Sequence, residues 1–386
     1  MKGIGSFFLA MVLLLQGHTV FAGESVKEPR VTAEGAVLVD GTSGRLLWGK
    51  NEKTPMEMAS TTKIMTAILI LERCQPKEVV TVSANGARQP KVHMGLAEGE
   101  QWYVEDLLKA MMLKSYNDAA VALAEHTSGS VEAFCREMTE KAKKIGAKDT
   151  VFGSPNGLDS HLSKEQHHAT PYDMGIITGY ALQNPKFREI ISLPSHTFCD
   201  VSGKKTHTAV NADRFLRMYS GALGVKTGYT NKAGNCFVGA AEREDITLVS
   251  VVLGCGWGKQ GKEQKWKDTM ALMDFGFAAY HKKQICQKGD IADSVAVERS
   301  PVDSVSVVLT EGYEGVFSDD EREKLKVSSQ LPKAISAPVE KGTKLGCAEI
   351  CLGEEVLARI PLITAEDVPA YTLSQWLHML AENWCR

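Results

Sequence analysis

No stretch of this 386-residue sequence is apolar over the roughly 18 residues that a bilayer-spanning helix requires. Positive charge is not in excess either: 44 Lys and Arg residues face 47 Asp and Glu residues, which offers no electrostatic surface for nucleic acid. The nine cysteines include no C-x-x-C pair, so neither a zinc ribbon nor a thioredoxin-like site is expected. A hydrophobic content of 44% is near the globular average and argues against wholesale disorder.

The first 22 residues have the pattern of a secretory signal peptide. Lys2 provides a positive start, residues 7–15 form a short apolar core, and residues 20–22 end in a small residue suited to cleavage. We therefore expect an exported protein, with an uncleaved N-terminal anchor as the alternative. The mature chain has 386 − 22 = 364 residues, enough for two domains.

The cysteines are scattered singly, and their number is odd. The closest two, Cys347 and Cys351, would lie roughly 13 Å apart on one strand, too far for a disulfide. Two interpretations stay open: another pairing, or free thiols that pack as small hydrophobic side chains in a reducing habitat.

Helical and strand patterns are mixed in the first two thirds of the chain. Residues 36–48 predict a hairpin around a turn at 41–44. Apolar residues at helical spacing predict helices at 60–71, 104–113, 117–125, 131–145 and 267–280. Residues 150–163 indicate an ordered loop, and two runs, 236–240 and 247–253, predict strands of a meander.

Beyond about Lys283, short β-rich runs alternate with turns, at 294–297, 305–309, 345–352 and 356–361, before a last helical stretch at 372–386. We therefore predict an α+β fold in which residues 23–283 form a domain of helices and an antiparallel sheet. Residues 284–366 would form a small all-β domain, and residues 367–386 an amphipathic helix.

Three short motifs occur in order: Ser60-x-x-Lys63, Ser115-Tyr116-Asn117 and Lys226-Thr227-Gly228. Two of them are weak when taken singly, because S-x-x-K recurs at Ser202 and S-x-N recurs at Ser83 and Ser154. Only K-T-G is unique in the chain.

The surrounding sequence separates Ser60 from its rivals. Ser60 begins an amphipathic helix, so it shares a helix face with Lys63, and the helix dipole favours negative charge developing at this end. Ser202 lies in a polar segment typical of an exposed loop. Ser115 falls at the junction of two helical runs, and Gly228 stands where the backbone could approach a ligand closely.

S-x-x-K, S-x-N and K-T-G together are the signature of penicillin-binding proteins and class A β-lactamases. A serine hydroxyl is a poor nucleophile until a neighbouring base takes its proton. Lysine can be that base only when neutral, and burial or a second cation lowers its pKa from the reference value near 10.4. We expect Lys226 to be this second cation beside Lys63.

Four longer blocks extend the resemblance: 59–67 (ASTTKIMTA), 150–159 (TVFGSPNGLD), 168–174 (HATPYDM) and 224–230 (GVKTGYT). The first closely resembles the nucleophile segment of low-molecular-mass D-alanyl-D-alanine carboxypeptidases, peptidase family S11, and the others are similar to further blocks of that family. The resemblance is strong over residues 33–280 and weak in the β-rich tail. It implies a β-lactamase/transpeptidase-like catalytic domain.

The resemblance also implies the catalytic roles. Ser60 would attack the carbonyl of the penultimate D-alanine of a peptidoglycan stem peptide, with Lys63 as general base. Ser115 would pass a proton to the leaving D-alanine, and water would hydrolyse the acyl-enzyme. β-Lactam antibiotics would acylate Ser60 and stay attached. No metal or organic cofactor would be required.

Substrate binding is implied for the remaining motif residues. Asn117 would hold the substrate amide, and Lys226 with Thr227 would bind the terminal carboxylate. The backbone N–H groups of Ser60 and Tyr229 would form the oxyanion hole, beside Gly228.

Two departures from the family pattern bear on these roles. The family usually has N-x-N-x-L-L before K-T-G, whereas residues 211–216 are NADRFL, so a carboxylate-binding group from this segment is left open. Gly153 and Ser154 replace the more usual asparagines ahead of Pro155, which could alter the shape of the loop.

Several other functions share part of this sequence pattern. A class A β-lactamase needs a deacylating glutamate, but residues 152–159 contain none and Glu165 lies outside any motif. A non-catalytic penicillin-binding wall protein is disfavoured because all five catalytic side-chain positions are intact. A metallopeptidase built on His161, His167 and His168 matches no zinc spacing, and His168 is interpreted as structural. D,D-endopeptidase action on cross-links is the same chemistry and stays open.

The last helical stretch carries an apolar stripe, formed by Leu373, Trp376, Leu377, Leu380 and Trp384. In the resembling family such a helix lies on the outer face of the cytoplasmic membrane, which implies peripheral membrane contact. The segment is acidic, however, which does not favour anionic lipid. A helix docked on the β domain is the alternative.

Overall fold

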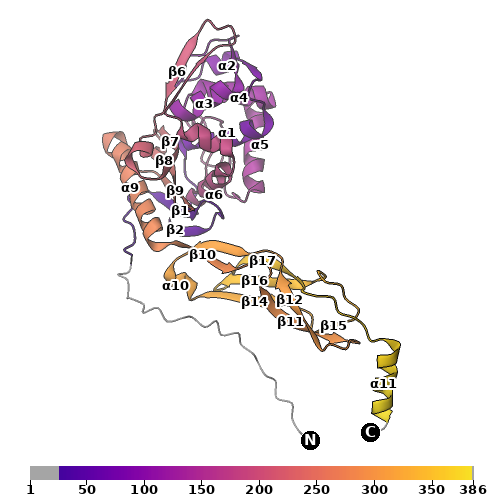
Figure 1. Cartoon of the computed structure of the whole chain (residues 1–386). Helices are drawn as coiled ribbons and strands as arrows, with labels where there is room; N and C mark the ends of the chain where they lie inside the picture. The colour runs from indigo at the N-terminus through magenta and orange to yellow at the C-terminus, as the bar shows by residue number, and fades with distance from the viewer. Residues whose placement is uncertain (1–25, 385–386) are drawn as a thin grey trace.

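The computed structural model describes residues 26–384, without the side chains of Met379 and residues 382–384. The expected signal peptide at 1–22 therefore lies outside the described residues. Figure 1 shows helices gathered around a central sheet, followed by a β-rich part and a last helix at the end of the chain. The predicted α+β fold with a C-terminal all-β domain is confirmed.

The central sheet has five antiparallel strands in the order β2-β1-β9-β8-β7. Their bounds are β1 Gly35–Asp40, β2 Leu46–Lys50, β7 Ala222–Thr230, β8 Gly234–Arg243 and β9 Ile246–Leu253. The turn between β8 and β9 consists of Glu244 and Asp245, both with positive φ, and allows the meander that the sequence predicts. The N-terminal hairpin is also confirmed, and its strand β1 pairs with β9 and so joins the hairpin to the meander.

Both faces of this sheet are buried because helices cover each of them. Alternate residues of β1 point to opposite sides: Ala36 and Leu38 pack with the core beneath α9 (Gly258–Ala279), whereas Val37 and Val39 pack with the core of the other helices. On that second side, α6 (Pro171–Leu182) packs against β1 and β9 (Figure 1). The central strands are therefore apolar at nearly every position.

The remaining helices of this part are η1 Ala59–Thr62, α1 Lys63–Arg73, α2 Ala84–Ala87, α3 Val104–Lys114, α4 Asn117–Ser128, α5 Val131–Lys144, α7 Pro185–Ser192 and α8 Phe215–Met218. The helices predicted from periodicity are confirmed. However, α9 begins at Gly258 and not at Lys267. The sequence did not reveal this earlier start, because the first turns of the helix are polar and show no apolar spacing. The sequence did not reveal α6, whose buried residues surround the whole helix and leave no amphipathic pattern.

Two short antiparallel strand pairs complete this part. β3 (Val79–Thr81) pairs with β4 (Gln101–Tyr103), and β5 (Ser195–Cys199) pairs with β6 (Thr206–Val210). Ser202, the rival S-x-x-K serine, lies exposed in the turn between β5 and β6, as its polar surroundings predict.

The C-terminal domain contains a two-stranded and a six-stranded sheet. β10 (His281–Cys286) pairs with β13 (Tyr313–Phe317), and Lys283 lies within β10. The larger sheet has the order β14-β16-β17-β12-β11-β15. Its strands are β11 Ile291–Glu298, β12 Ser304–Leu309, β14 Leu325–Gln330, β15 Ala334–Ser336, β16 Lys344–Leu352 and β17 Glu355–Thr364, with α10 Asp319–Arg322 before β14.

One arginine joins the two parts of the chain. Arg45, in the β1–β2 turn, donates to both carboxylate oxygens of Glu321 at 2.7 and 3.0 Å and also to the Val316 carbonyl. Its guanidinium carbon lies 5.0 Å from the centre of the Phe317 ring. A two-pronged ion pair of this kind fixes orientation as well as distance.

The last helix, α11 (Leu373–Trp384), exposes its apolar stripe. Leu373 is 77% exposed and Leu377 is 58% exposed, while the side chain of Trp384 is outside the described set. Within residues 26–384, no helix is both long and apolar enough to cross a membrane. The eight cysteines in this part of the chain are all unbridged.

Candidate active site

Ser60 lies in η1, a single tight turn that leads directly into α1. Lys63, at the first position of α1, places its Nζ 3.0 Å from Ser60 Oγ. Three residues along a helical turn bring two side chains to one face, so this contact follows from local spacing. The structure therefore brings together the serine and the lysine of S-x-x-K.

Lys63 is completely buried, and its Nζ is held by two groups from distant segments. It donates to Asn117 Oδ1 at 2.9 Å and to the carbonyl oxygen of Asn156 at 2.5 Å. Burial lowers the pKa of Lys63 well below its ordinary value, and the nearby Lys226 lowers it further, while Asp118 opposes both effects. The second-cation effect expected of Lys226 is therefore present.

Lys226 is itself buried and lies in the middle of strand β7. Burial lowers the pKa of Lys226 to about 7, and Asp213 acts in the opposite direction. Burial also raises the pKa of the Asp213 carboxyl to about 6. An anionic ligand that reaches Lys226 would therefore favour its charged form.

The K-T-G strand lies directly against η1 (Ala59–Thr62), which carries the predicted nucleophile Ser60 and is called the nucleophile turn below. A Cβ at Gly228 would lie 3.1 Å from both the Ala59 Cβ and the Ser60 backbone nitrogen. A side chain here would push β7 away from the turn by a few tenths of an ångström, which favours glycine as the third letter of the motif. The next residue, Tyr229, is therefore placed beside the Ser60 backbone, with its side chain half exposed.

Ser115 ends α3 in the left-handed conformation, with φ 66°. This conformation separates α3 from α4, which begins at Asn117. The Asn117 side chain donates to the Pro90 carbonyl at 3.1 Å and accepts from Lys63, so both ends of its amide are engaged. The neighbouring Asp118 was not singled out by the sequence, yet its buried carboxylate accepts three backbone N–H groups from residues 94–96.

One pocket of about 500 Å³ collects most of the predicted site. It is lined by Ser60, Lys91, Val92, Lys114, Ser115, Asn117, Leu158, Ala212, Thr227, Gly228, Tyr229, Asn235, Gly258, Lys262 and Lys265. Four of these lining residues are lysines, and none is acidic. Lys63 and Lys226 are buried and are not part of the lining. The pocket suits a substrate that carries carboxylates.

Two of the pocket lysines, Lys262 and Lys265, were missed by sequence reasoning. They lie in the polar first turns of α9, where no apolar periodicity marks a helix. Lys265 is buried, and burial lowers its pKa. A lysine in a polar run is ordinarily a solvated surface residue, so nothing in the sequence singled it out.

The loop at 150–163 packs onto the nucleophile turn, as an ordered loop should. Gly157 has φ 82°, and a Cβ there would lie 2.0 Å from the Ala59 carbonyl oxygen. Thr66 Oγ1 donates to the Pro155 carbonyl at 2.6 Å. Ser154, one of the departures from the family pattern, accepts the Gly157 N–H at 3.0 Å and so stabilises the turn.

His167 lies buried beneath this loop. The Gly153 N–H donates to its Nδ1 at 3.1 Å, so the ring carries its proton on Nε2, which lies 3.3 Å from Thr62 Oγ1. Thr62 in turn donates to the Ala59 carbonyl at 2.8 Å. Burial lowers the pKa of His167 to about 4. The ring is therefore neutral and braces the nucleophile turn.

The residues considered for a metallopeptidase or a β-lactamase do not line the pocket. His168 Nδ1 contacts the Lys164 carbonyl at 2.6 Å, and within the described residues the three histidines do not form a metal-binding cluster. Glu165 is exposed and does not line the pocket.

The segment at 211–216, which departs from the family pattern, uses its polar side chains to hydrogen-bond backbone groups. Asn211 donates to the carbonyls of Ile191 and Leu193. Asp213 accepts the N–H groups of Phe215 and Val225 and thereby positions the start of the K-T-G strand. Neither side chain lines the pocket.

Comparison with known proteins gives a consistent result. A family model described as D-alanyl-D-alanine carboxypeptidase matches residues 22–256, and one described as penicillin-binding protein 5, C-terminal domain, matches residues 280–370. The chain is 29% identical to the D-alanyl-D-alanine carboxypeptidase DacF of Bacillus subtilis, over 99% of this chain and 98% of that protein. It is 33% identical to DacB2 of Mycobacterium tuberculosis, over 66% of this chain and 85% of that protein.

Solved structures agree with this. Penicillin-binding protein 5 of Haemophilus influenzae matches with a TM-score of 0.73 and 27% identity, covering 89% of this chain and 99% of that one. The D-alanyl-D-alanine carboxypeptidase of Mycobacterium tuberculosis H37Rv matches with a TM-score of 0.61 and 33% identity, covering 67% and 95%.

The neutral His167 makes stability depend on pH. Because its pKa is about 4 in the folded chain and near 6.5 when unfolded, the unfolded state binds the proton more readily. The free energy of unfolding is therefore unaffected by His167 above about pH 6.5, and it decreases as the pH falls towards 4. The expected loss is about 3 kcal/mol.

Urea unfolding of the wild type and of His167→Gln at several pH values measures this loss. The variant should be less stable at neutral pH and should lack this part of the acid-induced decrease. An identical pH dependence in the two proteins would contradict the assignment of a buried, neutral ring.

Proposed function

The chain belongs to peptidase family S11, the serine D-alanyl-D-alanine carboxypeptidases, and we propose that Ser60 is the residue through which it forms its acyl-enzyme. Membership makes the protein a hydrolase that removes the terminal D-alanine from peptidoglycan stem peptides, and a penicillin-binding protein. The observation that carries the assignment of Ser60 is the buried Lys63 Nζ, 3.0 Å from the Ser60 hydroxyl.

The acylation step follows from this geometry. Neutral Lys63 accepts the Ser60 hydroxyl proton while Oγ forms a bond to the carbonyl carbon of the penultimate D-alanine. The carbonyl oxygen becomes an oxyanion, which the backbone N–H groups of Ser60 and Tyr229 stabilise. The close approach of Gly228 to the Ser60 nitrogen supports this pairing of amides.

Collapse of the tetrahedral intermediate needs a proton on the leaving nitrogen. The ammonium of Lys63 supplies it through the Ser115 hydroxyl as the carbon–nitrogen bond breaks, and free D-alanine leaves. Water then attacks the Ser60 ester, Lys63 accepts its proton, and the released Ser60 oxygen is protonated again. Ser115 lines the same pocket as Ser60, which supports this relay.

Binding of the substrate is assigned to the K-T-G strand and to the lysines of the pocket. Thr227, which lines the pocket, and the neighbouring buried Lys226 bind the terminal carboxylate, and Gly228 gives the strand its close approach. Asn117 holds both Lys63 and the substrate amide. We add Lys265 as a second cation for the carboxylate, since it lines the pocket and is close enough to Lys226 to lower its pKa.

The absence of acidic residues from the lining of the described pocket separates this function from that of a β-lactamase. Class A β-lactamases deacylate with the help of such a carboxylate, so we expect the penicillin ester on Ser60 to be long-lived. Cleavage of cross-linked peptides uses the same carbonyl and the same residues. Product analysis with a pentapeptide and a cross-linked dimer decides the balance between the two activities.

We also propose that the enzyme is exported. Residues 1–22 act as a signal peptide, and the mature enzyme works at the outer face of the cytoplasmic membrane or in the wall. The exposed stripe of α11 supports peripheral membrane contact, because Trp376 and the neighbouring Leu373, Leu377 and Leu380 are all largely exposed.

The first prediction concerns Ser60. Ser60→Ala should reduce D-alanine release from a pentapeptide by roughly 10⁴-fold or more and should abolish the covalent penicillin adduct seen by mass spectrometry. Ser202→Ala, which removes the serine of the second S-x-x-K, should behave as wild type. Release of D-alanine by Ser60→Ala, or turnover of penicillin faster than about one per second by wild type, would overturn the assignment.

The second prediction concerns Lys265. Lys265→Gln should raise KM for the pentapeptide by about 10- to 100-fold, the usual effect of losing one charge-assisted hydrogen bond. Lys259→Gln, on the exposed side of the same helix, is the matched control and should leave KM unchanged. An unaltered KM in Lys265→Gln would exclude it from the carboxylate site.

The third prediction concerns α11. Truncation after Tyr371 should move the protein from the membrane fraction to the soluble fraction while D-alanine release is kept. Association that survives truncation would show that α11 is not the membrane contact and would favour the docked-helix alternative.

A further inference from the structure

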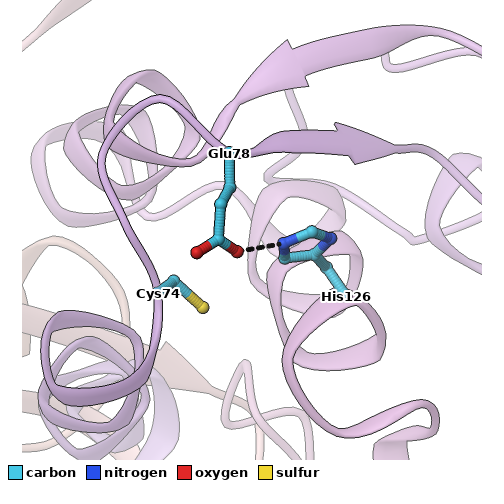
Figure 2. A group of neighbouring side chains, drawn as sticks. All are labelled: Cys74, Glu78 and His126. Carbon is cyan, nitrogen blue, oxygen red and sulfur yellow. Dashed lines mark hydrogen bonds and ion pairs between the residues drawn. The ribbon is translucent and has the colours of Figure 1, made fainter.

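Three metal-ligating side chains meet on the helical side of the molecule, away from the pocket. They are Cys74, directly after α1; Glu78, directly before β3; and His126, in the last turn of α4. Figure 2 shows the three side chains pointing toward one another from these separate segments. The thiol sulfur, one carboxylate oxygen and one imidazole nitrogen all lie within 4.8 Å of one another.

We propose that Cys74, Glu78 and His126 form a zinc-binding site that ties the end of α1 to the end of α4. Thiolate, imidazole and carboxylate are the ligands that Zn²⁺ uses in proteins. Bond lengths of about 2.0–2.3 Å in a tetrahedral site put neighbouring ligand atoms roughly 3.5 Å apart. Shifts of about an ångström therefore suffice, and the fourth position is left to water.

The groups around the three ligands also suit a metal. The backbone N–H of Gln75 donates to Glu78 Oε1 at 2.6 Å, which leaves Oε2 to face His126 Nε2 at 3.0 Å. Thr127 Oγ1 donates to the Leu123 carbonyl at 2.7 Å and lies 3.3 Å from the Cys74 sulfur, so it can accept the thiol proton and hold the sulfur in place. Partners of this kind orient the ligands of a metal and strengthen its binding.

The neighbouring cations are engaged elsewhere. Arg73 pairs with Glu137, and Lys77 pairs with Glu105 at 2.5 Å. In the described part of the chain, the ion pair of Glu78 is with His126, whose charge depends on protonation. No lysine or arginine among the described residues pairs with Glu78, so its carboxylate is available to a divalent cation.

The site is also open to an ion from solvent. The side chains of Glu78 and His126 are 39% and 24% exposed, and Cys74 is partly exposed. It is distinct from the catalytic pocket. Helices α1 and α4 carry Lys63 and Asn117 at their other ends, and α1 with its 11 residues spans roughly 16 Å. Zinc would therefore stabilise the two helices that hold the general base without taking part in acyl transfer.

Cobalt(II) and zinc titrations of the reduced full-length protein test the site. Wild type should bind one Co²⁺ with a thiolate-to-cobalt charge-transfer absorption, which Zn²⁺ displaces. Cys74→Ser should lose that absorption and bind Zn²⁺ at least about 100-fold more weakly, beyond the 10- to 100-fold effect of changing a group that only hydrogen-bonds to a ligand. Cys199→Ser, at an exposed thiol on β5, should match wild type.

Thermal unfolding gives an independent measure. Zinc should raise the melting temperature of wild type and of Cys199→Ser, but not that of Cys74→Ser, and D-alanine release should survive EDTA. If Cys74→Ser does not fold, His126→Gln decides, because it removes a partly exposed ring and keeps the thiol. Equal zinc affinity in wild type and His126→Gln, or an unchanged cobalt absorption in Cys74→Ser, would show that the cluster is only an ion pair beside a thiol.

Discussion

The contact between the buried Lys63 amine and the Ser60 hydroxyl is the constraint on which the rest of the structure depends. An amine is a base only after it has lost its proton, and burial disfavours its charged form. The fold must therefore keep water away from Nζ while giving it polar partners. Asn117 and the Asn156 carbonyl provide these partners, and each comes from a segment far from Ser60 in the sequence.

Much of the architecture supports this one buried group. Helices cover both faces of the central sheet, and its edge strand β7 brings Gly228 against the nucleophile turn and the buried Lys226 near Lys63. The loop at 150–163 closes over the same turn, and the neutral His167 braces it from below. The hydrogen-bond partners of Lys63 are uncharged acceptors, and the charged groups that affect its pKa are Lys226 and Asp118.

The pocket and the metal-ligating cluster lie at opposite ends of the same two helices. The N-termini of α1 and α4 carry Lys63 and Asn117, where hydrogen bonds fix them, while their C-termini face solvent beside Cys74 and His126. The ends that carry Lys63 and Asn117 are held by hydrogen bonds to the loops. The three ligands meet at the distant ends, where Arg73 already donates to Ser128 Oγ at 3.2 Å.

By itself the sequence determined the motifs, the helices with one apolar face and the strands of the meander, because each depends on spacing within a few residues. It singled out Ser60 over Ser202 by the helix that Ser60 begins. Only the tertiary structure placed Lys265 in the pocket, engaged Asn117 with Lys63, and gave the all-round apolar helix α6 its place on the sheet. Those features depend on contacts between segments far apart in the chain, for which no local pattern exists.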